Sequence, residues 1–292
     1  SKNIYKEIIA VCGSNDIVYR LCAGSFMSSL ASTTEYSGNF PKYKRDVFLD
    51  TQVILHILCV AYDDFEPGQL YDYKIARDLV SIARNDKNGL SLKFANTYIT
   101  EVKGHLNQAL QLIEIADAED RKFKLHTNNV FYNHYADLKE SVTLPDGIIT
   151  FKDYLYELFN LEDKDAEDDY RSFLDYSLAD QIRCLLNEAC IELFYLPLYE
   201  YEDTKKSEKA FNAVLKNNEK AHATLEHDVR MGQYLFDWED KPQLFFISRD
   251  HSFDLYRKKY AELFCRSTPY FWQLFTPVNF VNSIDLLEMK FD

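Results

Sequence analysis

Short apolar runs alternate with stretches of helical periodicity from residue 46 onward. Strands are predicted at 47–50 (VFLD), 90–95 (LSLKFA), 192–201 (ELFYLPLYEY), 243–248 (QLFFIS) and 271–277 (FWQLFTP). Helices are predicted at 52–61, 70–86, 96–116, 204–217, 219–237 and 252–264, and a short helix closes the chain. Because strands alternate with helices, the pattern predicts an α/β fold of three α/β/α layers around a mainly parallel central sheet. Pro197 favours an edge position for the strand at 192–201.

Three other segments complete the predicted organisation. Residues 3–31 are expected to form two helices, and residues 32–45 a linker, so that 1–45 is a helical N-terminal segment and 46–287 the main domain. Residues 111–190 are predicted to be a mainly helical insert at the rim of the sheet, with a solvated acidic run at 162–169. Within the insert, DGIITF at 146–151 resembles half a calcium loop, but a turn followed by a Thr150/Asp153 capping box is favoured.

Composition limits the function classes. The chain has 292 residues, 47% of them hydrophobic, which is ample for a large core. The net charge is −14 and no Lys/Arg block occurs, which argues against a large electrostatic footprint for duplex DNA. Nucleic acid would therefore be bound through a local groove, a metal ion or another chain. No signal peptide or membrane-length apolar run is present, so we expect a cytoplasmic protein without a membrane partner.

Cysteine and histidine patterns offer no zinc or redox motif. No CxxC pair occurs, and buried free thiols in a reducing cytosol are expected for Cys12, Cys22, Cys59, Cys184, Cys190 and Cys265. The seven histidines contain no HExxH pair, and they are interpreted as surface or packing residues.

Four acidic residues occupy positions where a carboxylate is costly. Asp50 and Asp250 each follow an apolar run, at the carboxyl end of a predicted strand, where ligands bind in open α/β sheets. Glu101 and Asp228 lie on predicted helices, beside the apolar stripe rather than opposite it. Any one of them could be a helix cap or an interface carboxylate, but the ordered set favours a functional site. Because grouped carboxylates repel one another, a divalent cation is the usual compensation, and oxygen ligands suit Mg²⁺ or Mn²⁺.

This ordered set resembles the PIN domain nucleases. The residues that carry the resemblance are LDTQV at 49–53, TYITEV at 97–102, EHDVR at 226–230, FISRD at 246–250 and LFTP at 274–277. Their order and their placement on strands and helices match the family pattern over about residues 46–110 and 190–287. Two departures are visible: Gln52 stands where the family usually has Asn, and the insert exceeds a minimal PIN domain.

The resemblance implies a metal-dependent endoribonuclease, a hydrolase of phosphodiester bonds that uses one or two Mg²⁺ or Mn²⁺ ions. It assigns both catalysis and metal binding to Asp50, Glu101, Asp228 and Asp250, with the two aspartates at the strand ends as the strongest candidates for direct ligands. Thr51 and Ser248 would hold the ligands or touch phosphate, and Asp254 is a reserve candidate. Family analogy favours single-stranded or structured RNA over DNA as the substrate.

A second interpretation stays open. The chain could be a non-catalytic PIN-like scaffold that acts through a protein partner, and a homo-oligomer is compatible with either interpretation. The acidic quartet favours the enzyme, since a scaffold has no reason to keep four mutually repelling carboxylates.

Overall fold

The structure is a computed structural model that describes residues 45–85, 89–118, 126–161, 170–215, 222–236, 244–263 and 272–288. The predicted helices at 3–31, the linker up to residue 44 and the acidic run at 162–169 lie outside the described residues.

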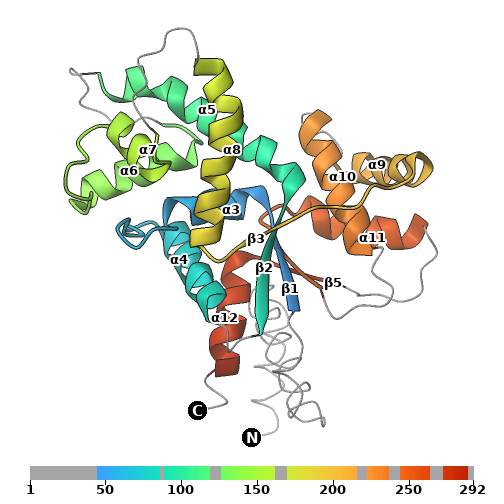
Figure 1. Cartoon of the computed structure of the whole chain (residues 1–292). Coiled ribbons are helices and arrows are strands. Elements are labelled where there is room, and N and C mark those ends of the chain that lie inside the picture. Colours follow the sequence, from blue (N-terminus) through green and yellow to red (C-terminus); the bar gives the residue numbers. More distant parts are fainter. Residues whose placement is uncertain are drawn as a thin grey trace, which may run out of the picture.

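The sheet of the described residues has five strands in the order β3-β2-β1-β4-β5, and every neighbouring pair is parallel (Figure 1). The strands are β1 (Arg45–Leu49), β2 (Leu90–Ala95), β3 (Glu192–Phe194), β4 (Leu244–Ile247) and β5 (Trp272–Phe275). The prediction of a parallel sheet is therefore confirmed. After the central strand β1 the chain builds one side of the sheet with β2 and β3, and then returns to build the other side with β4 and β5.

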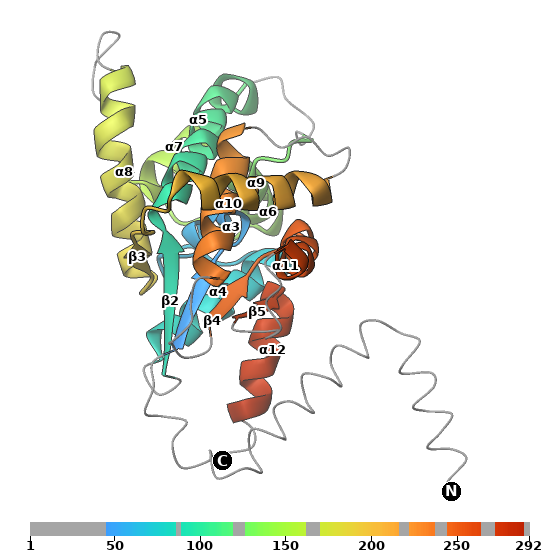
Figure 2. The ribbon, with the colours of Figure 1, turned by 90° about the vertical axis from the view of Figure 1, so that its right-hand side faces the viewer.

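Helices follow the strands as predicted, with ends shifted by a few residues. They are α3 (Thr51–Cys59), α4 (Tyr71–Arg84), the 3-10 helix η4 (Asn96–Tyr98), α5 (Ile99–Ala116), α6 (Val130–Ser141), α7 (Phe151–Leu158), α8 (Tyr170–Glu188), α9 (Tyr201–Leu215), α10 (His222–Phe236), α11 (Ser252–Leu263) and α12 (Pro277–Glu288). Figures 1 and 2 show α4 and α12 on one face of the sheet and α9, α10 and α11 on the other. No helix in these described ranges combines the length and the apolar character needed to span a membrane.

Strand β4 shows why both faces of the sheet must be covered. All four of its residues are buried, and successive side chains of a strand point to opposite faces. Phe246 packs against Phe253 of α11, with 4.6 Å between ring centroids, whereas the neighbouring Phe245 packs against Phe280 of α12 at 6.2 Å. A strand that is apolar on both sides is typical of a parallel sheet between two helical layers. The predicted three-layer arrangement is thus observed.

The edge strand β3 is shorter than predicted. It ends at Phe194, although the apolar run continues to residue 201. Pro197 has no backbone N–H to donate to a ladder, and the N–H of Leu196 instead donates to the side chain of Asn96 at 3.3 Å. The predicted strand at 192–201 is therefore wrong beyond residue 194, while its edge position is confirmed.

Within residues 111–190, the elements that the structure describes are the end of α5 and the helices α6, α7 and α8. The predicted capping box at the start of α7 is confirmed: Asp153 N donates to Thr150 Oγ1 at 3.1 Å, and Thr150 N donates to Asp153 Oδ2 at 2.8 Å. Asp117 accepts two further N–H groups from the first turn, those of Phe151 and Lys152. The end of α5 and the start of α7 are thereby joined.

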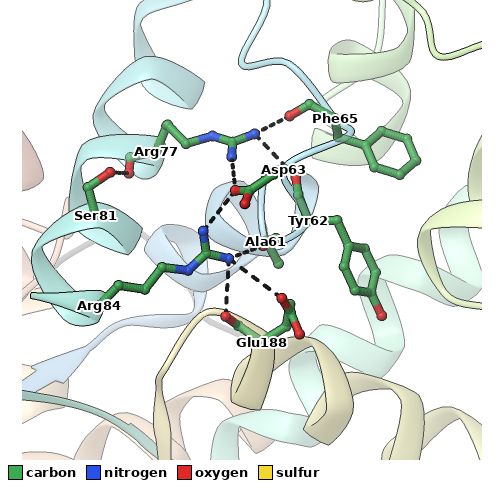
Figure 3. A network of polar contacts seen from close by, with 8 residues as sticks. All are labelled: Ala61, Tyr62, Asp63, Phe65, Arg77, Ser81, Arg84 and Glu188. Carbon is green, nitrogen blue, oxygen red and sulfur yellow. Dashed lines mark hydrogen bonds and ion pairs between the residues drawn. The ribbon is translucent and has the colours of Figure 1, made fainter.

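Two arginines of α4, Arg77 and Arg84, form a clamp at the base of this helical region (Figure 3). Both guanidinium groups donate to Asp63 Oδ1, at 2.9 and 2.8 Å. Arg84 also donates to the carbonyl oxygens of Ala61, in the turn after α3, and of Glu188, the last residue of α8. The arginine clamp thus holds the carboxyl ends of α3 and α8 together, where a positive charge complements a helix dipole.

The cysteines correct one expectation from the sequence. Cys59 is buried in α3 and carries a free thiol, as predicted. Cys184 and Cys190 are free but exposed, so the expectation of burial is wrong for these two. Cys184 lies on an exposed side of α8, and Cys190 lies in the turn that follows the helix.

Val142 generates a stability prediction. This residue ends α6 in the left-handed conformation, with φ 57° and ψ 39°, and is 89% exposed. A β-branched residue is strained there, whereas glycine is not. We expect Val142→Gly to raise the free energy of unfolding by about 1 kcal/mol, as measured by urea denaturation.

The matched control is Ile149→Gly, which removes another exposed β-branched residue of the same loop. Ile149 is not among the positive-φ residues, so its replacement should give no gain, because glycine only adds freedom to the unfolded chain. Equal effects of the two substitutions would show that backbone strain at Val142 is not the cause.

Candidate active site

The carboxyl ends of β1 and β4 place Asp50 and Asp250 side by side. The two strands are parallel neighbours with Leu49 opposite Ile247, and Asp50 N donates to the Ile247 carbonyl at 3.0 Å. The chain builds the sheet outward from β1 in one direction and from β4 in the other, so this is the topological switch point of the sheet. Ligands of open α/β sheets bind at such points, outside the carboxyl ends of the strands.

Asp50 is only 7% exposed and is held from two sides. Its Oδ1 accepts the N–H of Thr51 at 2.7 Å, at the start of α3, and its Oδ2 accepts the hydroxyl of Ser248 at 2.6 Å. The pKa of Asp50 is raised to about 6: burial is the largest cause, the negative charges of Asp250 and Glu101 add to it, and the two hydrogen bonds oppose the shift. Negative charge at this position is thus poorly compensated by the protein.

Ser248 links the two aspartates. Its hydroxyl donates to Asp50 and accepts the N–H of Asp250 at 2.9 Å. Asp250 is partly exposed, and its Oδ1 accepts the N–H of Ser252 at 2.8 Å, at the start of α11. Ser248 therefore occupies the supporting position that the sequence predicted. Asp254 lies further along, in the first turn of α11, and its assignment to the site stays a prediction.

Glu101 reaches the same place from the first turn of α5. Its Oε2 accepts the hydroxyl of Thr51 at 2.8 Å, which joins Glu101 to the residue beside Asp50. Its Oε1 lies 2.8 Å from Nδ1 of His227 in α10. Thr51 is thus a second predicted supporting residue that the structure brings to the cluster.

Asp228 completes the set from α10 and is almost fully buried. Its Oδ1 accepts the hydroxyl of Tyr98 at 3.2 Å. Burial raises the pKa of Tyr98 well above its usual value, and the negative charges of Asp228, Asp50 and Glu101 raise it further. Because one phenol experiences three of the carboxylates, the four acidic residues form one electrostatic cluster around the switch point. We call it the acidic cluster: Asp50, Glu101, Asp228 and Asp250.

Two members of this network were not predicted from the sequence. The histidines were interpreted as surface or packing residues; the ring of His227 does pack against Tyr98, but it also contacts the carboxylate of Glu101, which was not predicted. Tyr98, the last residue of η4, is buried, and its hydroxyl donates to Asp228. One signal was available: a buried tyrosine needs a partner for its hydroxyl, and an acidic residue on a buried helix margin is a candidate.

The donor chemistry of the acidic cluster fits a hard divalent cation. Carboxylate oxygens are the ligands that Mg²⁺ and Mn²⁺ prefer, and the pKa of Asp50 is raised by its burial and by the negative charges of Asp250 and Glu101. Arg249, between Ser248 and Asp250, is engaged by Asp72 at 2.7 Å. In the described residues, however, no three or more His, Cys, Asp or Glu side chains are arranged to hold an ion. Metal binding at the acidic cluster would require these side chains to move closer together than they are in this structure.

Comparisons with models of protein families, with curated proteins and with solved structures gave no match. The resemblance to PIN domain nucleases therefore stays a prediction from the sequence.

The pKa of Asp50 predicts how stability depends on pH. The folded-state pKa of about 6 lies above the ordinary value of 3.8, so burial of Asp50 lowers the free energy of unfolding progressively as the pH rises from about 4 to about 6. Asp50→Asn lacks this titration. We expect the stability of the variant relative to wild type to increase over that interval by about 2–3 kcal/mol, as measured by urea denaturation in EDTA.

Asp153→Asn is the matched control. Hydrogen bonding to Thr150 lowers the pKa of Asp153 from its ordinary value. The stability difference between this variant and wild type should stay nearly constant above about pH 5. A difference that is equally constant for Asp50→Asn would show that Asp50 is not desolvated as described.

Proposed function

We propose that the chain is a metal-dependent nuclease that hydrolyses phosphodiester bonds at the acidic cluster, with RNA as the first substrate to test. One observation carries the proposal: four carboxylates from separate elements gather at the switch point of a parallel sheet, and Asp50 is buried among like charges there. Perturbed carboxyl groups at such a position are typical of catalytic sites. The PIN-like order of the motifs supports the same reaction class.

In this proposal, Asp50 and Asp250 bind Mg²⁺ or Mn²⁺ directly, while Glu101 and Asp228 bind it directly or through water. A bound ion would supply a water of lowered pKa and would neutralise charge on the phosphate. The protein's own contribution is orientation. Ser248 and the N–H of Thr51 fix the two oxygens of Asp50, so the end of β4 and the start of α3 orient this carboxylate.

A bound divalent ion would also reduce the electrostatic repulsion between the acidic protein and a nucleic acid ligand. The protein has a net charge of −14, which repels a polyanion, and Arg249 beside the acidic cluster is paired with Asp72. An ion held between the carboxylates and a phosphate would reverse the sign of the local interaction. Binding of substrate should therefore depend on the cation as strongly as cleavage does.

The second candidate function is a non-catalytic scaffold that works through a protein partner. The observation in its favour is that the four carboxylates accept hydrogen bonds within the protein, and Asp50 and Asp250 accept N–H groups at helix starts. Exposed Tyr195 and Leu198, which follow the edge strand, are side chains of the kind found in protein contacts. Metal-dependent cleavage separates the two functions.

Cleavage assays give the direct test. We expect labelled RNA to be cut in Mg²⁺ or Mn²⁺ and not in EDTA, and Asp50→Asn and Asp250→Asn each to reduce the rate by about 100-fold or more. Asp153→Asn, which alters a helix start remote from the cluster, should retain the wild-type rate. Labelled single-stranded DNA in the same buffers identifies the preferred substrate. Undiminished cleavage by both cluster variants would contradict the assignment.

Melting curves test metal binding independently of activity. A cation that binds only the folded protein stabilises it by about 2–3 kcal/mol at a hundredfold excess over its dissociation constant. Millimolar Mn²⁺ should therefore raise the melting temperature of wild type. Asp250→Asn keeps an oxygen that can accept the N–H of Ser252 but loses one charge. In EDTA it should melt at or above the wild-type temperature, and it should lose most of the Mn²⁺ response.

A clearly lower melting temperature of Asp250→Asn in EDTA, together with a full Mn²⁺ response, would instead assign Asp250 a purely structural role. The loss of a buried hydrogen bond would then explain the destabilisation.

A further inference from the structure

The imidazole ring of His227, in α10, contacts the carboxylate of Glu101 in the acidic cluster. Its Nδ1 lies 2.8 Å from Oε1 of Glu101, and both side chains are largely buried, at 14% and 16% exposed. The imidazole stands edge-on to Tyr98, with 6.1 Å between ring centroids and an interplanar angle of 84°. Because an ionised carboxylate can only accept, Nδ1 must carry the hydrogen in this contact.

Both oxygens of Glu101 are thereby fixed. Thr51 of α3 donates to Oε2 and His227 of α10 donates to Oε1, each at 2.8 Å. A glutamate side chain has several rotatable bonds, and a single donor leaves its carboxylate free to turn about that contact. Two donors from different helices define both the position and the plane of the group.

The neighbouring residue strengthens this arrangement. Asp228 follows His227 and accepts the hydroxyl of Tyr98, three residues before Glu101. His227 and Asp228 are consecutive residues of α10. They therefore contact Glu101 and Tyr98, which lie three residues apart at the start of α5. A two-point contact between these helices sets the distance between Glu101 and Asp228, the two carboxylates that are not fixed by strand ends.

We propose that His227 is a positioning residue that orients Glu101 for the divalent cation. The inference rests on the proposed function, because it concerns the same acidic cluster. His227 acts through Glu101: the hydrogen bond from Nδ1 holds the carboxylate toward Thr51 and Asp50. Partners that orient a metal-binding side chain in this way contribute about 10- to 100-fold to metal affinity.

The test measures Mn²⁺ affinity by titration calorimetry, without substrate. His227→Ala should weaken binding by about tenfold or more. His227→Asn should restore most of the affinity, because its amide nitrogen occupies the place of Nδ1, whereas His227→Gln, which extends its amide toward the place of Nε2, should not. The control is His126→Ala, which removes an exposed histidine before α6 and should leave the affinity unchanged. Circular dichroism and melting curves verify that each variant is folded.

A double substitution identifies the route of the effect. If His227 acts through Glu101, then adding His227→Ala to Glu101→Gln should cause no further loss of Mn²⁺ affinity. A full additional loss would overturn the inference, since His227 would then act on its own.

The remaining outcomes are distinct. Wild-type binding of Mn²⁺ with unchanged affinity in His227→Ala overturns the positioning role and leaves the proposed function standing. Failure of the wild type to bind Mn²⁺ overturns both. If His227→Ala does not fold, the comparison of His227→Asn with His227→Gln decides, and equal affinities of these two variants overturn the inference.

Discussion

Removing the carboxylate of Asp50 from water, next to two other negative side chains, is the unfavourable step around which the rest of the structure is arranged. The sheet brings it there, because β1 and β4 end together at the switch point. Ser248 and the N–H of Thr51 offset part of the cost by hydrogen bonding to both oxygens. The pKa of Asp50 is nevertheless raised, mainly by burial, so the hydrogen bonds compensate the cost only in part.

Helix starts and ligand sites coincide in this class of fold, which makes a capping carboxylate hard to separate from a metal ligand. The N–H groups of a helix that follows a strand point to the edge where ligands bind. Asp50 and Asp250 accordingly accept N–H groups at the starts of α3 and α11. One carboxylate is sufficient for each helix start, however, and capping gives no reason for Glu101 and Asp228 to approach from two further helices. The number of carboxylates at this place therefore distinguishes a ligand site from helix capping better than the position of any one of them.

Local patterns in the sequence predicted the parallel sheet, its helices and the four carboxylates, because strand ends and helix margins are determined by nearby residues. Contacts between distant residues were not predictable in this way. His227 and Glu101 are 126 residues apart, and nothing in either segment indicates the other. The end of β3 was missed for the same reason, since the partner of Leu196 is Asn96, 100 residues earlier. Periodicity describes which side of an element is buried, but not which polar group it meets there.

The short helix α3 connects the acidic cluster with the arginine clamp. Its first turn carries Thr51, directly after Asp50, and the turn beyond its last residue is gripped by the arginine clamp together with the end of α8. The nine residues of α3 span about 14 Å along the helix axis. Because α3 has contacts at both of its ends, the acidic cluster and the carboxyl end of α8 are joined through a single helix.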